Sequence, residues 1–143
     1  MDTVDFQILK MLKNNSRITN SEISKQVSLS LPAVSERIRK LEELDVIRRY
    51  TVKLNREKFS LNLMAFILVA LDQKVKAELF RETVRNCDSI LECHHITGEY
   101  DYLLKVAVKD TTELESLISA LKRSTGVART NTIVTLSTQK EGD

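Results

Sequence analysis

Apolar residues near the start of the chain repeat with the period of an α-helix. They follow the i, i+4, i+7, i+8 spacing of an amphipathic stripe at Val4, Ile8, Met11 and Leu12. This spacing predicts a first helix, with two aspartates, Asp2 and Asp5, near its positive end. Three polar residues, 14–16, then break the pattern and end the helix.

Two further helices are indicated before residue 45. Residues 19–22, Thr-Asn-Ser-Glu, have the form of a capping box, which predicts a short second helix. Ser30 can cap a third helix, because Pro32 then falls in the first turn, where its missing N–H costs little. This helix should run to about Leu44. Its buried stripe comprises Val34, Ile38 and Leu41.

The pattern changes in the second half of the chain, where β-type runs alternate with helical spacing. Strands are expected at 63–71, 89–96, 102–108 and 127–137, and helices over 77–87 and 114–121. Thr112 and Glu115 have the spacing of a capping pair for the last helix. The order βαββαβ predicts a ferredoxin-like sheet with both helices on one face. The uncovered apolar face should pack on a second subunit as an isologous dimer.

Composition excludes several classes of protein. The longest apolar run has nine residues, 63–71, whereas a membrane helix needs roughly 20. No basic patch precedes an apolar stretch at the amino terminus, so we expect a cytoplasmic protein without membrane contact. The chain has 3 glycines, too few and too far apart for the glycine-rich loops that cradle nucleotide phosphates.

Candidate catalytic and metal-binding groups are few. Cys87 and Cys93 lack the spacing of a zinc site or a disulfide framework and are expected to be free thiols. His94 and His95 are adjacent in a predicted strand, so they point to opposite faces and cannot chelate one metal. No serine or cysteine has a base at motif spacing. We therefore expect no enzyme, no metal and no cofactor, although a ferredoxin-like scaffold can host many activities.

Charge is distributed unevenly along the chain. Residues 1–60 carry 12 Lys/Arg against 8 Asp/Glu, a formal excess of +4, whereas residues 61–143 carry 10 against 12, which gives −2. A basic excess favours a polyanionic partner for the first half. A solvated helix face laced with salt bridges explains the same excess, and charge alone leaves both interpretations open.

Three helices, the last two joined by a short turn and the third basic on its exposed face, describe a helix-turn-helix. Small residues at the start of the third helix let its backbone approach base edges, and Arg or Lys further along reach guanines or phosphates. The β-branched segment 46–52 can form a small wing that lays two arginines on the DNA backbone. The predicted DNA-binding residues are Ser30, Pro32, Ala33, Ser35, Glu36, Arg37, Arg39, Lys40, Arg48 and Arg49.

The sequence resembles the Lrp/AsnC family, the leucine-responsive or feast/famine regulators of bacteria and archaea. The resemblance is carried by residues 5–9 and 30–42, by Val46-Ile47 with Tyr50, and by residues 97–105. It implies an α+β chain in which a winged helix-turn-helix, 1–52, and a linker, 53–62, precede a ligand-sensing and oligomerisation (RAM) domain, 63–143. It also implies dimers, often assembled as octamers, and a response to amino acids.

The sequence departs from the family at three places where glycine is common. Ser28, Asp45, and Ser60 or Asn62 occupy them. Aspartate and asparagine tolerate left-handed backbone conformations better than most residues, and serine can turn by bonding its own backbone. We therefore expect the fold to survive these substitutions.

The loop Thr97–Asp101 is the candidate effector site. Gly98 lets backbone amides point at a ligand carboxylate, and Asp101 can accept the α-ammonium of an amino acid. The resemblance places effectors around this segment and implies roles for Thr97, Gly98, Tyr100, Asp101 and Thr132. The alternative is a hairpin turn in which Gly98 supplies a positive φ and Asp101 caps local amides.

The leading hypothesis is therefore a sequence-specific transcription regulator, modulated by an amino acid, that binds double-stranded DNA as a homo-oligomer. A second hypothesis is an architectural protein that wraps or bridges DNA with little sequence choice and no effector. An enzyme is the third, and it leaves the basic helix-turn-helix without a role.

Overall fold

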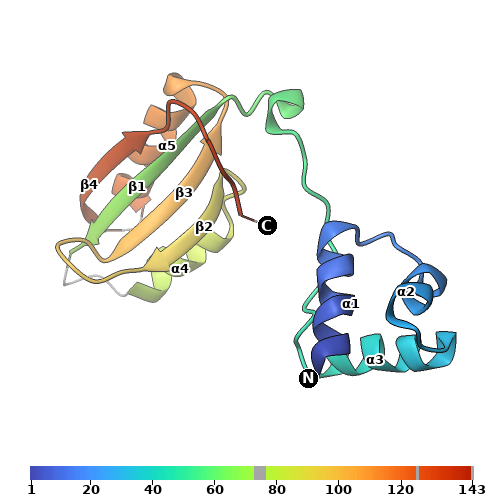
Figure 1. Ribbon diagram of the computed structural model, residues 1–143. Helices are drawn as coiled ribbons and strands as arrows, with labels where there is room; N and C mark the ends of the chain where they lie inside the picture. The colour runs from blue at the N-terminus through green and yellow to red at the C-terminus, as the bar shows by residue number, and fades with distance from the viewer. Residues whose placement is uncertain (73–76, 125, 143) are drawn as a thin grey trace. The chain divides into compact units, whose positions relative to one another are not determined.

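A computed structural model describes residues 1–72, 77–124 and 126–142. The chain divides into two compact units, Met1–Leu54 and the residues from Asn55 onward (Figure 1). Among the helices of these residues, none has the length and apolar character required to cross a membrane.

The first unit consists of three helices, α1 (Thr3–Asn14), α2 (Asn20–Val27) and α3 (Leu31–Glu43). One apolar core holds them together. Its buried residues are Ile8, Leu12, Ile23, Val34, Ile38 and Leu41. The predicted stripes of α1 and α3 therefore meet around α2, and the helix-turn-helix arrangement is confirmed.

Side chains cap all three helices. Thr19 and Glu22 form the predicted capping box of α2, and the Ser30 hydroxyl accepts a hydrogen bond from the backbone N–H of Ala33 in α3. Asp2 and Asp5 form a further capping box at α1, where each carboxylate accepts from the other residue's N–H, at 2.9 and 2.8 Å. The sequence pattern had placed these aspartates near the helix end without pairing them.

Among the described residues, left-handed backbone occurs at three residues other than glycine, Ser28 (φ 55°), Asp45 (φ 56°) and Ser60 (φ 60°). All three are among the positions at which the sequence resemblance led us to expect a turn made without glycine. Ser28 ends α2, and Ser60 ends a 3-10 turn, Arg56–Phe59, which lies inside the expected linker. The chain thus keeps the turns that glycine would make, at the steric cost of a Cβ in this region.

The segment 46–52, predicted as a small wing, has no regular secondary structure, so no β-strand forms there. Its β-branched residues favour an extended backbone, but a strand also needs a hydrogen-bonded neighbour. The described elements of the first unit are all helical and supply no such neighbour.

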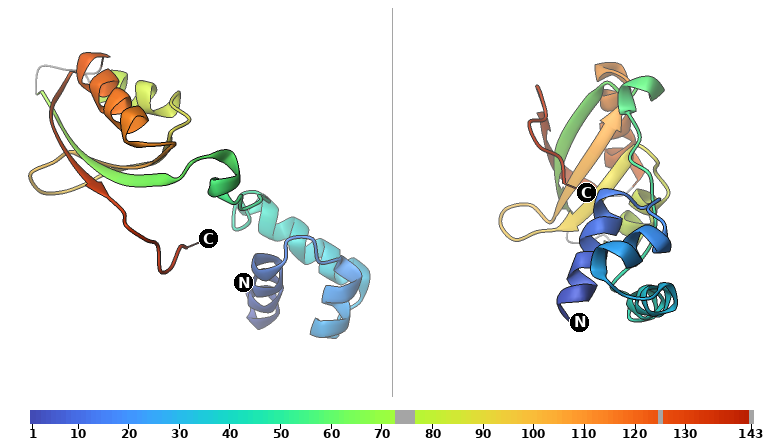
Figure 2. Two further views of the ribbon diagram at one scale, coloured as in Figure 1. Left: turned by 90° about the horizontal axis from the view of Figure 1, so that it is seen from above. Right: turned by 45° about the vertical axis from the view of Figure 1, so that its right-hand side comes forward.

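The second unit is a four-stranded antiparallel sheet with the order β2-β3-β1-β4. The strands are β1 (Leu63–Leu71), β2 (Ile90–His95), β3 (Tyr102–Val108) and β4 (Val127–Val134). Two helices, α4 (Ala77–Arg85) and α5 (Thr111–Ser124), lie on one face of the sheet (Figure 2). The predicted βαββαβ fold is confirmed, with β4 ending three residues earlier than expected.

The capping pair predicted for α5 is wrong. The helix begins at Thr111, so Thr112 lies within its first turn. Asp110 supplies the cap, because its carboxylate accepts from the N–H of Glu113 at 2.9 Å. The Thr112–Glu115 spacing therefore pointed to a cap two residues too late in the chain.

Alternation along the strands separates two faces of the sheet. Ala65, Ile67 and Val69 of β1 point toward the helices and are fully buried with Phe80 of α4. The opposite face, which we call the open face, carries the alternate residues and is covered by neither α4 nor α5. Its larger apolar members are Met64, Phe66, Leu68, Leu103 and Ile133, and polar residues such as Lys105 and Asn131 lie among them.

Candidate nucleic-acid interface and effector loop

The outward face of α3 gathers eight of the ten predicted DNA-binding residues. Because Val34, Ile38 and Leu41 are buried, the polar positions between them turn to solvent. The exposed members are Ser30, Pro32, Ser35, Glu36, Arg39 and Lys40, and the half-buried ones are Ala33 and Arg37. The start of this face presents the small side chains of Ser30, Ala33 and Ser35 with Pro32 and the exposed Leu31, and the charged groups begin at Glu36 in the second turn.

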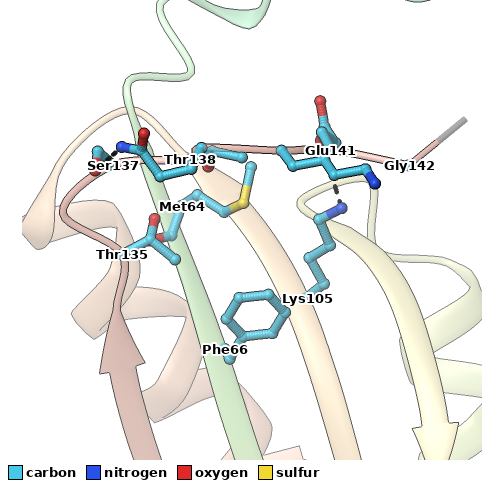
Figure 3. A pocket seen from close by; sticks show the side chains of 10 residues that line it. Met64, Phe66, Lys105, Thr135, Ser137, Thr138, Glu141 and Gly142 are labelled. Atoms are coloured by element: carbon cyan, nitrogen blue, oxygen red, sulfur yellow. Dashed lines mark hydrogen bonds and ion pairs between the residues drawn. The ribbon is translucent and has the colours of Figure 1, made fainter.

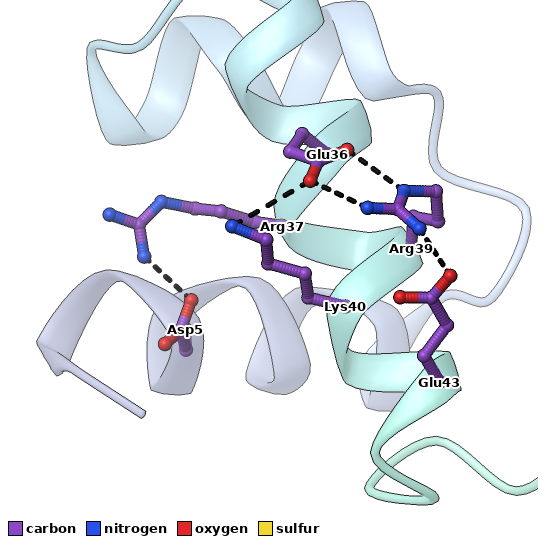
Figure 4. Close-up of polar contacts among 6 residues, drawn as sticks. All are labelled: Asp5, Glu36, Arg37, Arg39, Lys40 and Glu43. Atoms are coloured by element: carbon purple, nitrogen blue, oxygen red, sulfur yellow. Dashed lines mark hydrogen bonds and ion pairs between the residues drawn. The ribbon is translucent and has the colours of Figure 1, made fainter.

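Arg39 is held by carboxylates on its own helix. Its Nε and Nη2 donate to the two oxygens of Glu36 at 2.8 and 2.7 Å, and its Nη1 donates to Glu43 (Figure 4). Lys40 Nζ lies 3.6 Å from the same Glu36 carboxylate. The hydrogen bonds and charge of Arg39, with a smaller contribution from Lys40, lower the pKa of Glu36 to about 2.

Arg37 connects α3 to the start of α1. Its Nη1 donates to Asp2 at 2.8 Å and to Asp5 at 2.7 Å, the same carboxylates that form the α1 capping box. The structure therefore gives Arg37 a role in holding two helices together, which sequence periodicity did not reveal. Its predicted contact with DNA stays a prediction.

Arg48 and Arg49 are exposed in the segment that follows α3. Arg48 Nε lies 3.4 Å from Asp45, whereas Arg49 makes no ion pair with any residue that the structure describes. The Tyr50 hydroxyl donates to Glu42 at 2.8 Å, and partial burial together with this hydrogen bond raises the pKa of Tyr50 to about 12. Tyr50 thereby anchors the two arginines to the end of α3.

The predicted effector loop joins β2 to β3. Gly98 has a φ of 111°, with open space where a Cβ would stand. The Asp101 carboxylate accepts from the N–H of Leu71 at 2.7 Å, and the Asp101 N–H donates to the carbonyl of Val69 at 2.9 Å. The positive φ of Gly98 fits the hairpin-turn interpretation, whereas the Asp101 carboxylate bonds an amide of β1 rather than a local one, and effector contact by the loop stays a prediction.

Arg129 of β4 also contacts this loop, although sequence reasoning did not single it out. Its guanidinium lies 4.7 Å from the centre of the Tyr100 ring and donates to the carbonyl of Glu99 at 3.2 Å. Thr132, by contrast, pairs with Ile67 on the helix-covered face. The structure therefore brings Arg129, rather than Thr132, against the loop.

An open hollow of about 380 Å³ lies between the open face and residues 135–142 (Figure 3). Met64, Phe66 and Lys105 line its floor, and Glu141 reaches back to Lys105 at 3.5 Å and to Arg56 at 2.8 Å. None of the five predicted effector residues lines this hollow.

Comparison with known proteins identifies the family. The family description "Lrp/AsnC ligand binding domain" matches residues 64–143, more than half of the chain. The chain belongs to the Lrp/AsnC family. A second description, "Winged helix-turn-helix DNA-binding", matches residues 1–48. This Lrp/AsnC protein is thus a DNA-binding transcriptional regulator and not an enzyme.

Individual relatives match this chain over nearly all of its length. The HTH-type transcriptional regulator FL11 of Pyrococcus abyssi is 35% identical, with 99% of this chain and 93% of the relative covered. The leucine-responsive regulatory protein of Escherichia coli K12 is also 35% identical, and the match covers 100% of this chain and 89% of that protein. A transcriptional regulator of Neisseria meningitidis, crystallised in complex with L-methionine, has a similar fold, with a TM-score of 0.93. It is 33% identical to this Lrp/AsnC protein, and the match covers 99% of this chain and 93% of that one.

The Arg37 ion pairs predict how the stability of the first unit depends on pH. Backbone hydrogen bonds and Arg37 lower the pKa of both Asp2 and Asp5 below the ordinary 3.8. Their contribution is complete above that value and is lost as the pH falls through the lowered folded-state values. For Arg37→Gln we expect the unfolding temperature of the first unit to fall less than in wild type between pH 5 and pH 2. NMR signals of residues 1–54 measure this unfolding. Arg49→Gln, which removes an unpaired arginine, should keep the wild-type profile, and identical profiles for both variants would contradict the assignment.

Proposed function

We propose that this protein binds specific DNA sequences as a dimer, with α3 in the major groove, and that an amino acid modulates its binding. The observation that carries the proposal is the outward face of α3, where small side chains from Ser30 to Ser35 precede the charged residues Glu36, Arg39 and Lys40. An α-helix fits the major groove, and small side chains at its start let the backbone approach base edges.

Phosphate contact is assigned to the segment after α3. Within α3 itself, the three cations Arg37, Arg39 and Lys40 are matched by three carboxylates, so the helix has no net charge. Arg49 is exposed without an ion pair to described residues, and Arg48 stands beside it. These two arginines therefore supply the sequence-independent attraction to the DNA backbone.

Self-association is assigned to the open face. Ile133 is 53% exposed there, beside the half-buried Phe66 and Leu68, and α4 and α5 cover only the other side. An apolar sheet face packs well on an identical face related by a two-fold axis. Such a dimer would present two recognition helices about 34 Å apart along one face of the duplex.

An amino-acid effector is supported by the family of the second unit and by the loop geometry. The Neisseria relative was solved with L-methionine. In this chain the loop offers backbone amides around Gly98, the Asp101 carboxylate, and a guanidinium, Arg129, stacked on Tyr100. As a regulator of chromosomal genes, the protein would act in the cytoplasm.

DNA binding predicts a steep dependence of affinity on salt. Arg49→Ala should reduce the slope of log K against log salt by about 1, because one phosphate contact is lost. Fluorescence anisotropy with a duplex selected from a random library measures this slope. Arg81→Ala, an exposed arginine on α4, is the matched control and should leave the slope unchanged. A wild-type affinity that is insensitive to salt would refute the phosphate assignment.

The open-face assignment predicts that Ile133→Glu dissociates the dimer. A charge placed within a paired apolar face is desolvated without a partner, and this disfavours association. Sedimentation velocity of the full chain should show dimers or larger species for wild type and monomers for the variant. Leu79→Glu, at a residue 51% exposed on α4, is the control and should associate like wild type. Association that survives Ile133→Glu would move the interface elsewhere.

Amino-acid binding predicts a rise in unfolding temperature with one or a few of the twenty amino acids. A ligand present at 100 times its dissociation constant stabilises the folded state by about 2.7 kcal/mol. Arg129→Gln should weaken this response if the loop is the site. If no amino acid raises the unfolding temperature, and if DNA footprints do not depend on sequence, the architectural alternative would be favoured.

A further inference from the structure

Glu36 stands at the centre of the ion pairs on the outward face of α3. Its carboxylate accepts two hydrogen bonds from Arg39, and one of its oxygens also lies 3.6 Å from Lys40 Nζ. All three side chains are about half exposed, so the cluster belongs to the surface that would meet DNA (Figure 4).

The contacts of Arg39 use one N–H of each of its three guanidinium nitrogens. Nε and Nη2 face Glu36, and Nη1 faces Glu43. The fork of Nε and Nη2 is the part of an arginine that binds a phosphate, or the O6 and N7 of guanine, with two hydrogen bonds. In the free protein this fork is already used within the helix.

These ion pairs are weak enough to exchange. Exposed pairs contribute little to stability, because water screens them and side-chain freedom is lost when they form. A single phosphate offers Arg39 a contact like the one it leaves, while the Glu36 carboxylate would then face a polyanion without a partner. Like charges brought together in this way act against binding.

A base edge can resolve this conflict. In the major groove, guanine offers two acceptors to the Arg39 fork, and cytosine and adenine each offer an exocyclic amino group that donates to a carboxylate. A site that presents both satisfies Arg39 and Glu36 together. A site that presents only phosphates leaves Glu36 unpaired.

We propose that Glu36 is a specificity-determining residue that holds Arg39 and Lys40 away from phosphates on unrelated DNA and releases them at sites where an exocyclic amino group faces its carboxylate. This inference rests on the proposed function. It assigns to Glu36 the suppression of non-specific binding, in addition to any direct reading of a base.

The test compares Glu36→Gln with wild type on two duplexes, one selected by the wild-type protein from a randomised library and one with the same composition in shuffled order. On the shuffled duplex the variant should bind more tightly, and its slope of log K against log salt should steepen by about 1 to 2, because Arg39 and Lys40 become available to phosphates. The ratio of affinities for selected and shuffled duplex should fall about tenfold.

Glu43→Gln is the matched control. It removes the same charge from the same helix and also contacts Arg39, but it leaves the Arg39 fork on Glu36. Its affinity ratio should change far less than that of Glu36→Gln. Glu36→Asp, which keeps the carboxylate, should restore most of the wild-type ratio.

Two outcomes overturn the inference while the proposed function stands. In the first, Glu36→Gln and Glu43→Gln raise non-specific affinity equally, which means that net charge alone is responsible. In the second, Glu36→Gln keeps the wild-type ratio. If wild-type protein binds neither duplex with a steep salt dependence, the proposed function itself fails, and the role of Glu36 fails with it.

Discussion

Burial of Val34, Ile38 and Leu41 against α1 and α2 sets the rotation of α3 about its own axis, and the chemistry of the DNA-facing surface depends on that rotation. Each residue of an α-helix turns about 100° from the previous one, so a register one residue away would bury Ser35 and Arg39. The capping of α3 by Ser30 fixes where the helix starts. The Ser30 cap and the buried apolar stripe of α3 together determine which polar side chains point outward, toward the proposed DNA surface.

Charge balance on α3 changes how the basic half of the chain should be understood. The excess of cations over residues 1–60 does not lie on the recognition helix, where Glu36 and Glu43 face Arg39. It lies in part in the segment that carries Arg48 and Arg49, which Tyr50 ties to the helix through Glu42. Attraction to phosphates and reading of bases are thus assigned to neighbouring but different elements, so each can be tuned separately. The solvated salt-bridged face describes the cations of α3, and the polyanion interpretation stays a prediction for Arg48 and Arg49.

Features that depend on neighbours in sequence could be predicted from it. Amphipathic stripes, the Thr19 and Ser30 caps and the βαββαβ order all follow local rules. Ser28, Asp45 and Ser60, at or beside the three places that the resemblance singled out, adopt the left-handed conformation.

Contacts between distant residues could not be predicted in this way. Arg37 and Asp2 are 35 positions apart in the sequence, and a strand and a helix separate Tyr100 from Arg129. The spacing of residues along the chain therefore does not predict these contacts. The β-branched segment 46–52, predicted as a wing, forms no strand for a related reason. Propensity describes one strand, whereas pairing requires a second.

The contacts of the 97–101 loop suggest how an effector would act. Asp101 bonds the loop to the end of β1, and Arg129 of β4 donates to Glu99 and stacks on Tyr100, so the loop that joins β2 to β3 also contacts β1 and β4. A ligand that binds there must compete with these contacts or add to them, and either change is transmitted to the sheet. Because the open face of the same sheet is assigned to subunit pairing, the ligand would alter assembly, and with it the spacing of two recognition helices, while leaving the surface of each α3 unchanged. Effector control and base recognition can then vary independently in this protein.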